Sequence, residues 1–310
     1  MEKMKILVTG ANGLLGQTII RQLLEKKYEV VATGRGPDRA EVTPSAPTYY
    51  KSVDITDGPA IEQFILEHKP TVIVHAAAMT QVDQCELHKQ ECYNINVTAT
   101  RFIIDAAKAV GSRFIYVSTD FIFDGNDGPY KEDDEPSPVN YYGSTKMAAE
   151  KAVMESGLDY AIARTILVYG NVPATGRSNI IGFVRESLEA NRPIKMVTDQ
   201  VRTPTFVEDL ATGIILIIEK KGKGIYHLSG EDLMTPYDIA IETAKYFGLN
   251  EALISKSTSE EIKQPAVRPP KTGFDISKAK SELGYKPHSF QEGLKQLYVV
   301  LPKAGSGNNR

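Results

Sequence analysis

Two side chains four positions apart, Tyr142 and Lys146, together have the chemistry to move a proton. On a helix this spacing places both on one face, within reach of a common point. A phenol is a poor acid near neutral pH because its unperturbed pKa is about 10, and a neighbouring ammonium group favours the phenolate. The pair predicts that Tyr142 acts as a general acid or base and that Lys146 tunes it. Tyr141 has a threonine four residues later and lacks this geometry.

A hydroxyl side chain precedes this pair, at the end of the apolar run RFIYVST. The run predicts a strand of a parallel sheet, and open α/β sheets bind ligands beyond the carboxyl ends of their strands. Thr119 is the candidate to hold a substrate oxygen, and Ser118 is the alternative. Thr119, Tyr142 and Lys146 are therefore the predicted catalytic residues.

A glycine-rich turn near the N-terminus predicts a dinucleotide site. The predicted strand KILVT runs into GANGLLG, and TIIRQLLEKK continues with helical periodicity. Glycines let the backbone approach a pyrophosphate, and the start of a helix offers unpaired N–H donors. The spacing is GxxGxxG, a departure from the common GxGxxG. The predicted cofactor contacts in this turn are Gly10, Asn12, Gly13, Leu14, Leu15 and Gly16.

The next predicted strand, EVVATG, indicates which dinucleotide binds. It lacks a terminal acidic residue to hold the ribose of NAD, and Arg35 follows it. An arginine here suits the 2′-phosphate of NADP, so NADPH is the preferred cofactor and NADH the alternative. Asp54 and Ile55 are placed to reach the adenine, although an aspartate there is equally an ordinary helix cap. His75 is expected to be a packed core histidine. The three small residues after it, Ala76, Ala77 and Ala78, are expected to lie against the cofactor.

Short β-branched runs alternate with helical segments through the first half of the chain. This alternation predicts a doubly wound α/β fold of the Rossmann type, with a parallel sheet covered on both faces. We expect this domain to span about residues 1–170, with a returning segment at about 206–230. Irregular segments at 171–205 and 231–303 predict a smaller C-terminal substrate-binding lobe, and residues 304–310 predict a disordered tail.

The composition excludes some partners. A formal charge of −3 offers no basic field for nucleic acid or for an anionic membrane. The N-terminal apolar run stops at a glycine, which is typical neither of a signal peptide nor of a membrane span. Cys85 and Cys92 are expected two turns apart on one helix face, about 10 Å from each other and too far for a disulfide. We therefore expect a cytoplasmic protein.

Over nearly its whole length the chain resembles the extended short-chain dehydrogenase/reductase family, and within it the dTDP-4-dehydrorhamnose reductases. The chain departs from this group at His75, where asparagine is expected, and at Arg202, where a small or aromatic residue is expected. The stretches that carry the resemblance are ILVTGANGLLG, HAAAMTQVDQCE, NINVTAT, VSTDFIFDG, PVNYYGSTKMAAE, RTILVYG, TDQVRTPTFVEDLA and RPPKTGFDISKAKSELGY.

The resemblance implies an NADPH-dependent oxidoreductase that reduces the C4 ketone of a nucleotide-activated deoxysugar, as in dTDP-rhamnose biosynthesis. It implies that Tyr142 protonates the ketone oxygen, and it suggests a homodimer. Arginines in the lobe are candidates to clamp the substrate pyrophosphate. The expected substrate contacts are Val82, Asp83, Asn179, Arg202 and Arg268.

Two other functions stay open at this stage. One is a nucleotide-sugar epimerase or dehydratase, because a dehydratase usually needs an acidic residue beside the catalytic hydroxyl and Asp120 follows Thr119. The other is a non-catalytic NADP-binding subunit, similar to the regulatory subunit of methionine adenosyltransferase. The intact set of Thr119, Tyr142 and Lys146 favours an enzyme.

Overall fold

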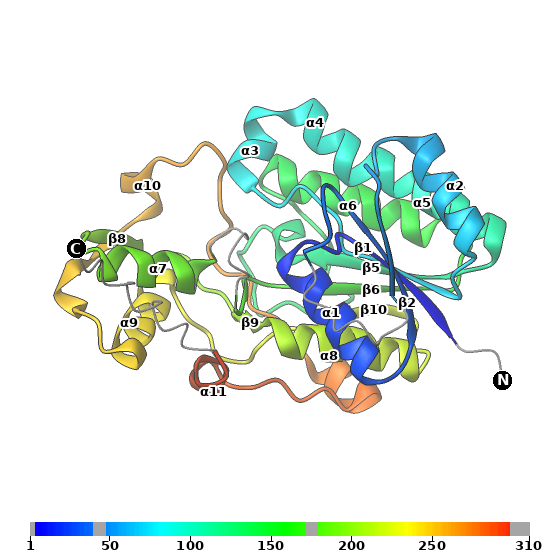
Figure 1. The fold of residues 1–310 in the computed structure, drawn as a ribbon. Helices are drawn as coiled ribbons and strands as arrows, with labels where there is room; N and C mark the ends of the chain where they lie inside the picture. Colours follow the sequence, from blue (N-terminus) through cyan, green and yellow to red (C-terminus); the bar gives the residue numbers. More distant parts are fainter. Residues whose placement is uncertain (1–3, 40–47, 172–178, 298–310) are drawn as a thin grey trace, which may run out of the picture.

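A computed structural model of the chain describes residues 4–39, 48–171 and 179–297. Its centre is a seven-stranded parallel sheet with the strand order β10-β6-β5-β4-β1-β2-β3 (Figure 1). The predicted doubly wound α/β class is confirmed. The strands are β1 (Lys5–Thr9), β2 (Glu29–Gly34), β3 (Thr48–Ser52), β4 (Val72–His75), β5 (Arg113–Thr119), β6 (Tyr160–Thr165) and β10 (Gly224–His227).

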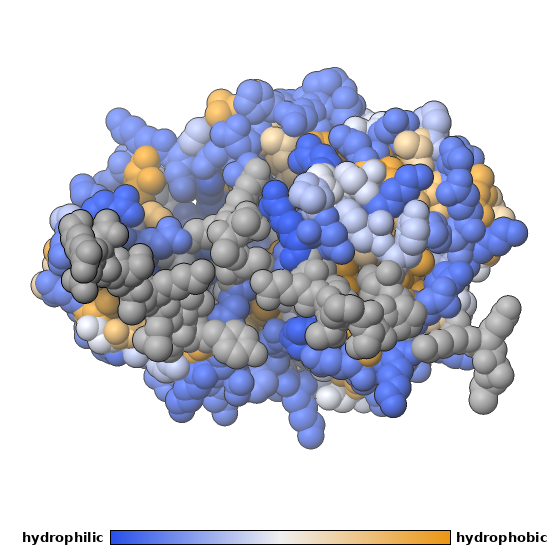
Figure 2. All heavy atoms as spheres, in the orientation of Figure 1, coloured by the Kyte–Doolittle hydropathy of each residue, from blue (hydrophilic) through white to orange (hydrophobic). Residues whose placement is uncertain are grey.

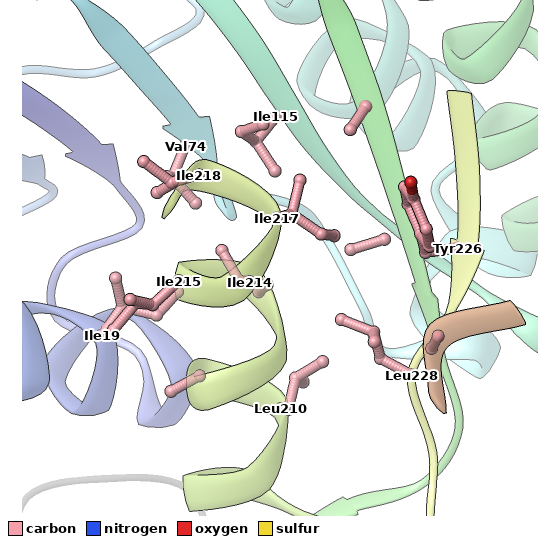
Figure 3. Packing of buried hydrophobic residues seen from close by; sticks show 14 of the residues in the cluster. Ile19, Val74, Ile115, Leu210, Ile214, Ile215, Ile217, Ile218, Tyr226 and Leu228 are labelled. Atoms are coloured by element: carbon pink, nitrogen blue, oxygen red, sulfur yellow. The ribbon is translucent and has the colours of Figure 1, made fainter. Parts of the chain in front are cut away.

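Helices cover both faces of this sheet. On one face, α1 packs against α8, and Ile19 of α1 lies beside Ile215 of α8 (Figure 3). The other face is covered by α2, α5 and α6, whose apolar side chains form a second core with the alternate residues of the strands. The covering helices are α1 (Leu14–Glu25), α8 (Val207–Glu219), α2 (Gly58–His68), α5 (Ala99–Val110) and α6 (Tyr141–Met154).

This two-sided cover explains the continuous apolar runs in the strands. Successive side chains of a strand point to opposite faces, so a strand covered on both faces buries every residue. In β1 the consecutive residues Ile6, Leu7 and Val8 are all 0% exposed. The parallel pairing of β1 with β4 and of β4 with β5 places the carboxyl ends of these three strands side by side. The predicted site residues follow these strand ends.

A smaller lobe lies at one end of the molecule (Figure 1). Its core joins α7 and α9 to the short sheet of β8 and β11. The pair β7 and β9 connects this lobe to the sheet, and α8 and β10 then return to the large domain. These elements are β7 (Val168–Tyr169), α7 (Ile180–Glu189), β8 (Ile194–Val197), β9 (Thr205–Phe206), α9 (Pro236–Phe247) and β11 (Ile254–Ser257).

Short helical turns complete the fold. The segment expected to form a loop at 172–178 and the tail expected at 304–310 lie outside the described residues. The turns are α3 (Val82–Leu87), α4 (Lys89–Tyr93), η1 (Asn94–Thr98), η2 (Asp120–Ile122), η3 (Glu251–Leu253), α10 (Ser259–Ile262), η4 (Ala279–Leu283) and α11 (Phe290–Lys295).

The surface is mostly polar. On the face shown in Figure 2, hydrophilic side chains predominate and apolar ones are scattered. Among the described residues, no helix has the length and apolar character needed to cross a membrane.

The structure corrects the expected placement of the two cysteines. The helix breaks at His88, whose φ and ψ of −124° and 59° end α3 before α4 begins. Cys85 and Cys92 therefore do not share one helix, and their buried side chains lie together in one cluster with Tyr142. The prediction of a separation of about 10 Å is wrong because it continued one helix across the break. Both cysteines are free thiols.

Candidate active site

The glycine turn between β1 and α1 leaves no room for side chains at two positions. Gly10 has a φ of +71°, and a Cβ there would lie 2.8 Å from the backbone nitrogen of Ala77. A Cβ on Gly16 would overlap the carbonyl oxygen of Gly10. No side chain in the described part of the chain caps the start of α1. The exposed backbone and the open helix start fit a pyrophosphate, because N–H groups and the helix dipole both favour an anion.

Replacing Gly16 by alanine is expected to weaken dinucleotide binding and to destabilise the fold by about 1–3 kcal/mol. The added methyl group pushes α1 away from the Gly10 carbonyl. Fluorescence titration with NADPH and urea unfolding measure the two effects. Gly13→Ala is the graded control, since its Cβ would stand 3.3 Å from the same oxygen and its φ of −83° suits any residue. Equal losses in the two variants would contradict this explanation.

The side chain of Asn12 holds the loop that carries Arg35. Its amide nitrogen donates to the carbonyl oxygens of Arg35 and Pro37, each at 2.9 Å, and its oxygen accepts from the Arg39 N–H at 2.9 Å. The Arg35 side chain itself is exposed. Asn12, predicted as a cofactor contact, thus joins the glycine turn to the end of β2.

Asp54 lies close to this loop. Its carboxylate accepts from the Thr56 N–H at 2.9 Å, and this bond holds the pKa of Asp54 below its ordinary value, with Arg35 adding a smaller effect. Asp57, not Asp54, caps α2 by accepting from the Ala60 N–H at 3.1 Å. Asp54 therefore forms the turn before that cap, and its contact with adenine stays a prediction, as does that of the buried Ile55.

His75 is a core residue, as its sequence context indicated. Its ring nitrogens contact the hydroxyls of Thr9 at 2.8 Å and Thr100 at 3.0 Å. Complete burial lowers its pKa to about 3, so the imidazole is neutral. The small residues after it reach the glycine turn, since Ala76 and Ala77 lie against Gly10.

The structure brings the three predicted catalytic residues together at the carboxyl end of β5. Asn140 caps α6 by accepting from the Gly143 N–H at 2.8 Å, which places Tyr142 in the first turn. The Thr119 hydroxyl lies close enough to the Tyr142 phenol to affect its pKa. Burial raises the pKa of Tyr142 and the nearby Thr119 hydroxyl opposes that rise, so the phenol is protonated at neutral pH.

Lys146 lies one turn further along α6. Its ammonium group donates to the Val117 carbonyl at 2.8 Å and lies 4.1 Å from the centre of the Tyr116 ring. Burial lowers the pKa of Lys146 to about 7, against the opposing charge of Glu150. Lys146 thus changes its charge in the range where an enzyme works.

This burial predicts a pH-dependent stability. Between about pH 7 and the ordinary lysine pKa of 10.5, Lys146 is neutral in the folded chain and charged in the unfolded chain. The unfolded chain then binds more protons, so the free energy of unfolding rises with pH in this window. We expect the wild type to gain stability relative to Lys146→Met from pH 7 to 10 in urea unfolding. Parallel pH profiles would contradict this assignment.

The geometry favours Thr119 over Ser118. The Thr119 hydroxyl donates to Asp120 at 3.1 Å, accepts from the Phe121 N–H at 3.3 Å and lies close enough to Tyr142 to affect its pKa. Ser118 is buried, and its hydroxyl has no hydrogen-bond partner among the described residues.

Asp120 is a buried carboxylate whose hydrogen-bond and ion-pair partners cannot be predicted from the sequence. It accepts hydrogen bonds from Thr119 and Thr272 and lies 3.7 Å from the Nε of Arg202. Burial raises the pKa of Asp120, and the arginine opposes that rise. A threonine 152 residues away carries no sequence signal for this role.

Segment 266–272, which we call the strap, runs along the edge of the sheet that carries the predicted catalytic residues. Arg202 donates to the carbonyl oxygens of Pro269 at 2.6 Å and Pro270 at 3.3 Å. Arg268 forms a two-bond ion pair with Asp83 at 2.5 and 2.8 Å. The structure thus gives both predicted substrate arginines partners within the chain, and their contact with substrate stays a prediction.

The remaining predicted substrate contacts also have structural roles. Asn179 caps α7, accepting from the N–H groups of Ile181 at 3.0 Å and Gly182 at 3.1 Å. Val82 packs beside the cysteines and Tyr142. Asp83 is the ion-pair partner of Arg268, although the sequence predicts the two residues as independent substrate contacts.

Comparison with known proteins decides the family. The family model described as the RmlD substrate binding domain matches residues 4–301. The chain belongs to this family. Among RmlD-like solved structures, dTDP-4-dehydrorhamnose reductase from Bacillus anthracis in complex with NADP has a TM-score of 0.84 and 29% identity, covering 95% of this chain and 98% of that one.

Two curated relatives of this RmlD-family chain carry different functions. The probable low-salt glycan biosynthesis reductase Agl14 of Haloferax volcanii is 32% identical over 95% of this chain and 97% of its own. Methionine adenosyltransferase 2 subunit beta of Bos taurus is 32% identical over 94% of this chain and 86% of its own. The relatives of this chain thus include both a probable reductase and a protein named as a subunit of another enzyme.

Proposed function

We propose that the chain reduces the C4 ketone of a nucleotide-activated deoxysugar with NADPH. The observation that carries this proposal is that Thr119 at the end of β5 meets Tyr142 in the first turn of α6, with Lys146 one turn away and the glycine turn on the same edge of the sheet. The similarity to reductases that act in sugar pathways supports it. In this proposal the lobe of 171–205 and 231–303 binds the sugar nucleotide.

The residues that would hold the cofactor lie at the glycine turn and in the segments around it described above. The glycine turn and the open start of α1 would hold the pyrophosphate, and the alanines after β4, which lie against Gly10, would border it. Arg35 would bind the 2′-phosphate, and Asp54 with Ile55 would border the adenine. Bound NADPH supplies the hydride.

The chain's own residues control the proton. Tyr142 is protonated at neutral pH and gives its proton to the oxygen that was the ketone. Thr119 holds that oxygen with its hydroxyl. Lys146, when charged, stabilises the tyrosinate that remains and binds the nicotinamide ribose.

The surroundings of Asp120 favour a reductase over a dehydratase. A dehydratase needs an acid free to reach the substrate. Here the carboxylate is buried and already engaged by Thr119, Thr272 and Arg202. Asp120 therefore holds the strap and Thr119 in place.

The test is NADPH consumption by the purified chain with dTDP-4-dehydro-6-deoxy-L-mannose. We expect stoichiometric oxidation of NADPH and formation of the alcohol, followed by absorbance and by mass spectrometry of the product. NADPH binding without turnover of this or other 4-keto nucleotide sugars would overturn the proposal and favour a binding subunit, as in the methionine adenosyltransferase relatives.

A further inference from the structure

Tyr50 of β3 contacts the loop that follows β2. Its hydroxyl lies 2.6 Å from the carbonyl oxygen of Gly36 and 3.2 Å from that of Gly34. The same hydroxyl lies 2.9 Å from the amide nitrogen of Asn12, which shares its two protons among this hydroxyl and the carbonyl oxygens of Arg35 and Pro37. Because a phenol has one proton, the shorter contact to Gly36 is the better donor bond.

Gly36 is held at both of its backbone groups. While Tyr50 binds its carbonyl, the N–H of Gly36 donates to the hydroxyl of Ser52 at 3.0 Å. The φ of Gly36 is +80°, in the left-handed region that favours glycine. Two side chains of β3 thus fix the residue directly after Arg35.

Asn12 fixes the same loop from the other side. Its amide binds the carbonyl oxygens of Arg35 and Pro37, and Tyr50 in turn binds that amide. The backbone around Arg35 is therefore immobilised while its side chain is exposed. Fixing the backbone beforehand lowers the ordering cost of using an exposed arginine to bind an anion.

We propose that Tyr50 is a positioning residue that determines the preference for NADP(H) over NAD(H). It fixes the loop in the conformation from which the Arg35 guanidinium meets the adenosine 2′-phosphate. The two cofactors differ only in that phosphate, so Tyr50 affects one and spares the other. The inference rests on the proposed function only in its use of a dinucleotide at the glycine turn.

The test compares two adjacent tyrosines. Tyr50→Phe removes the hydroxyl that binds Gly36 and Asn12. Tyr49→Phe is the matched control, because Tyr49 is 49% exposed and its ring lies against Phe64 and His68, with centroids 6.3 and 4.5 Å away. Calorimetric titration with adenosine 2′,5′-bisphosphate and with AMP, which differ only in the 2′-phosphate, measures both affinities without any turnover.

We expect Tyr50→Phe to raise the Kd for adenosine 2′,5′-bisphosphate about 3- to 10-fold, the loss of one or two net hydrogen bonds, while the Kd for AMP stays unchanged. Tyr49→Phe should change neither. Arg35→Ala should remove the same preference, and adding Tyr50→Phe to it should cause no further loss, because both act through one contact.

Equal weakening of both ligands by Tyr50→Phe would show a purely structural role and would overturn the inference. No change for either ligand would overturn it as well. A wild type that prefers the 2′-phosphorylated ligand but reduces no keto sugar would refute the proposed function and leave this inference standing. A wild type without that preference would refute this inference and leave an NADH-dependent reductase standing.

Discussion

Tyr142→Phe is expected to lower the kcat of keto-sugar reduction about 10²- to 10⁴-fold, the usual contribution of a general acid. The substitution removes only the hydroxyl, which is the proposed proton donor and lies near Thr119. The ring keeps its edge contact with Phe121, whose centroid lies 5.8 Å away. The Kd for NADPH should therefore stay within about twofold of the wild type. Single-turnover kinetics and fluorescence titration measure the two quantities.

Tyr141→Phe is the control for this variant. Tyr141 stands beside Tyr142 on α6, and its ring lies 5.3 Å from the ammonium of Lys89, a contact that phenylalanine retains. Its kcat should match the wild type. A Tyr142→Phe enzyme with normal kcat, or a Tyr141→Phe enzyme with an equal loss, would show that the proton comes from another group.

Arg164→Met is expected to destabilise the fold by about 3–5 kcal/mol, because it leaves a buried charge without its partner. Arg164 of β6 and Glu150 of α6 have side chains 2% and 1% exposed, and they bond through two nitrogens at 2.8 and 3.1 Å. The arginine also donates to the Glu132 carbonyl at 3.2 Å. Urea unfolding of the apo chain measures the loss without reference to any activity.

Two further variants separate the charge effect from simple loss of packing. Arg164→Met combined with Glu150→Leu should recover much of the stability, since a well-packed apolar pair often replaces a buried ion pair at little cost. Lys151→Met, next along the same helix, breaks an exposed pair with Glu155 at 3.8 Å and should change stability by less than about 1 kcal/mol. If the double variant were as unstable as Arg164→Met alone, cavity formation would explain the loss.

The parts of the structure that the sequence predicts are those set by local spacing. Apolar runs between helical segments identify the strands, since strands buried on both faces need unbroken apolar sequence. The i, i+4 spacing of Tyr142 and Lys146 predicts their common helix face, and the glycine turn is predicted by three glycines at fixed offsets.

The parts that the sequence does not predict depend on contacts between distant residues. The ion pair of Asp83 with Arg268 joins residues 185 positions apart, and nothing in either segment indicates the other. The break at His88 occurs without glycine or proline, so a continuous helix was the natural expectation. Tyr50 has no local signal either, because its role arises from the pairing of β2 with β3.

The strap has a consequence for gating. It is tied to the large domain through the Arg268–Asp83 ion pair, and Arg202 joins it to the Asp120 carboxylate that bonds Thr119. A lobe that swung outward to admit a sugar nucleotide would have to break the Arg268–Asp83 and Arg202–Asp120 ion pairs, whereas Thr119 and Asp120 would stay together because they are neighbours at the end of β5. Opening would leave the buried Asp120 carboxylate without its arginine, and this cost favours the closed arrangement in which Asp120 keeps both partners.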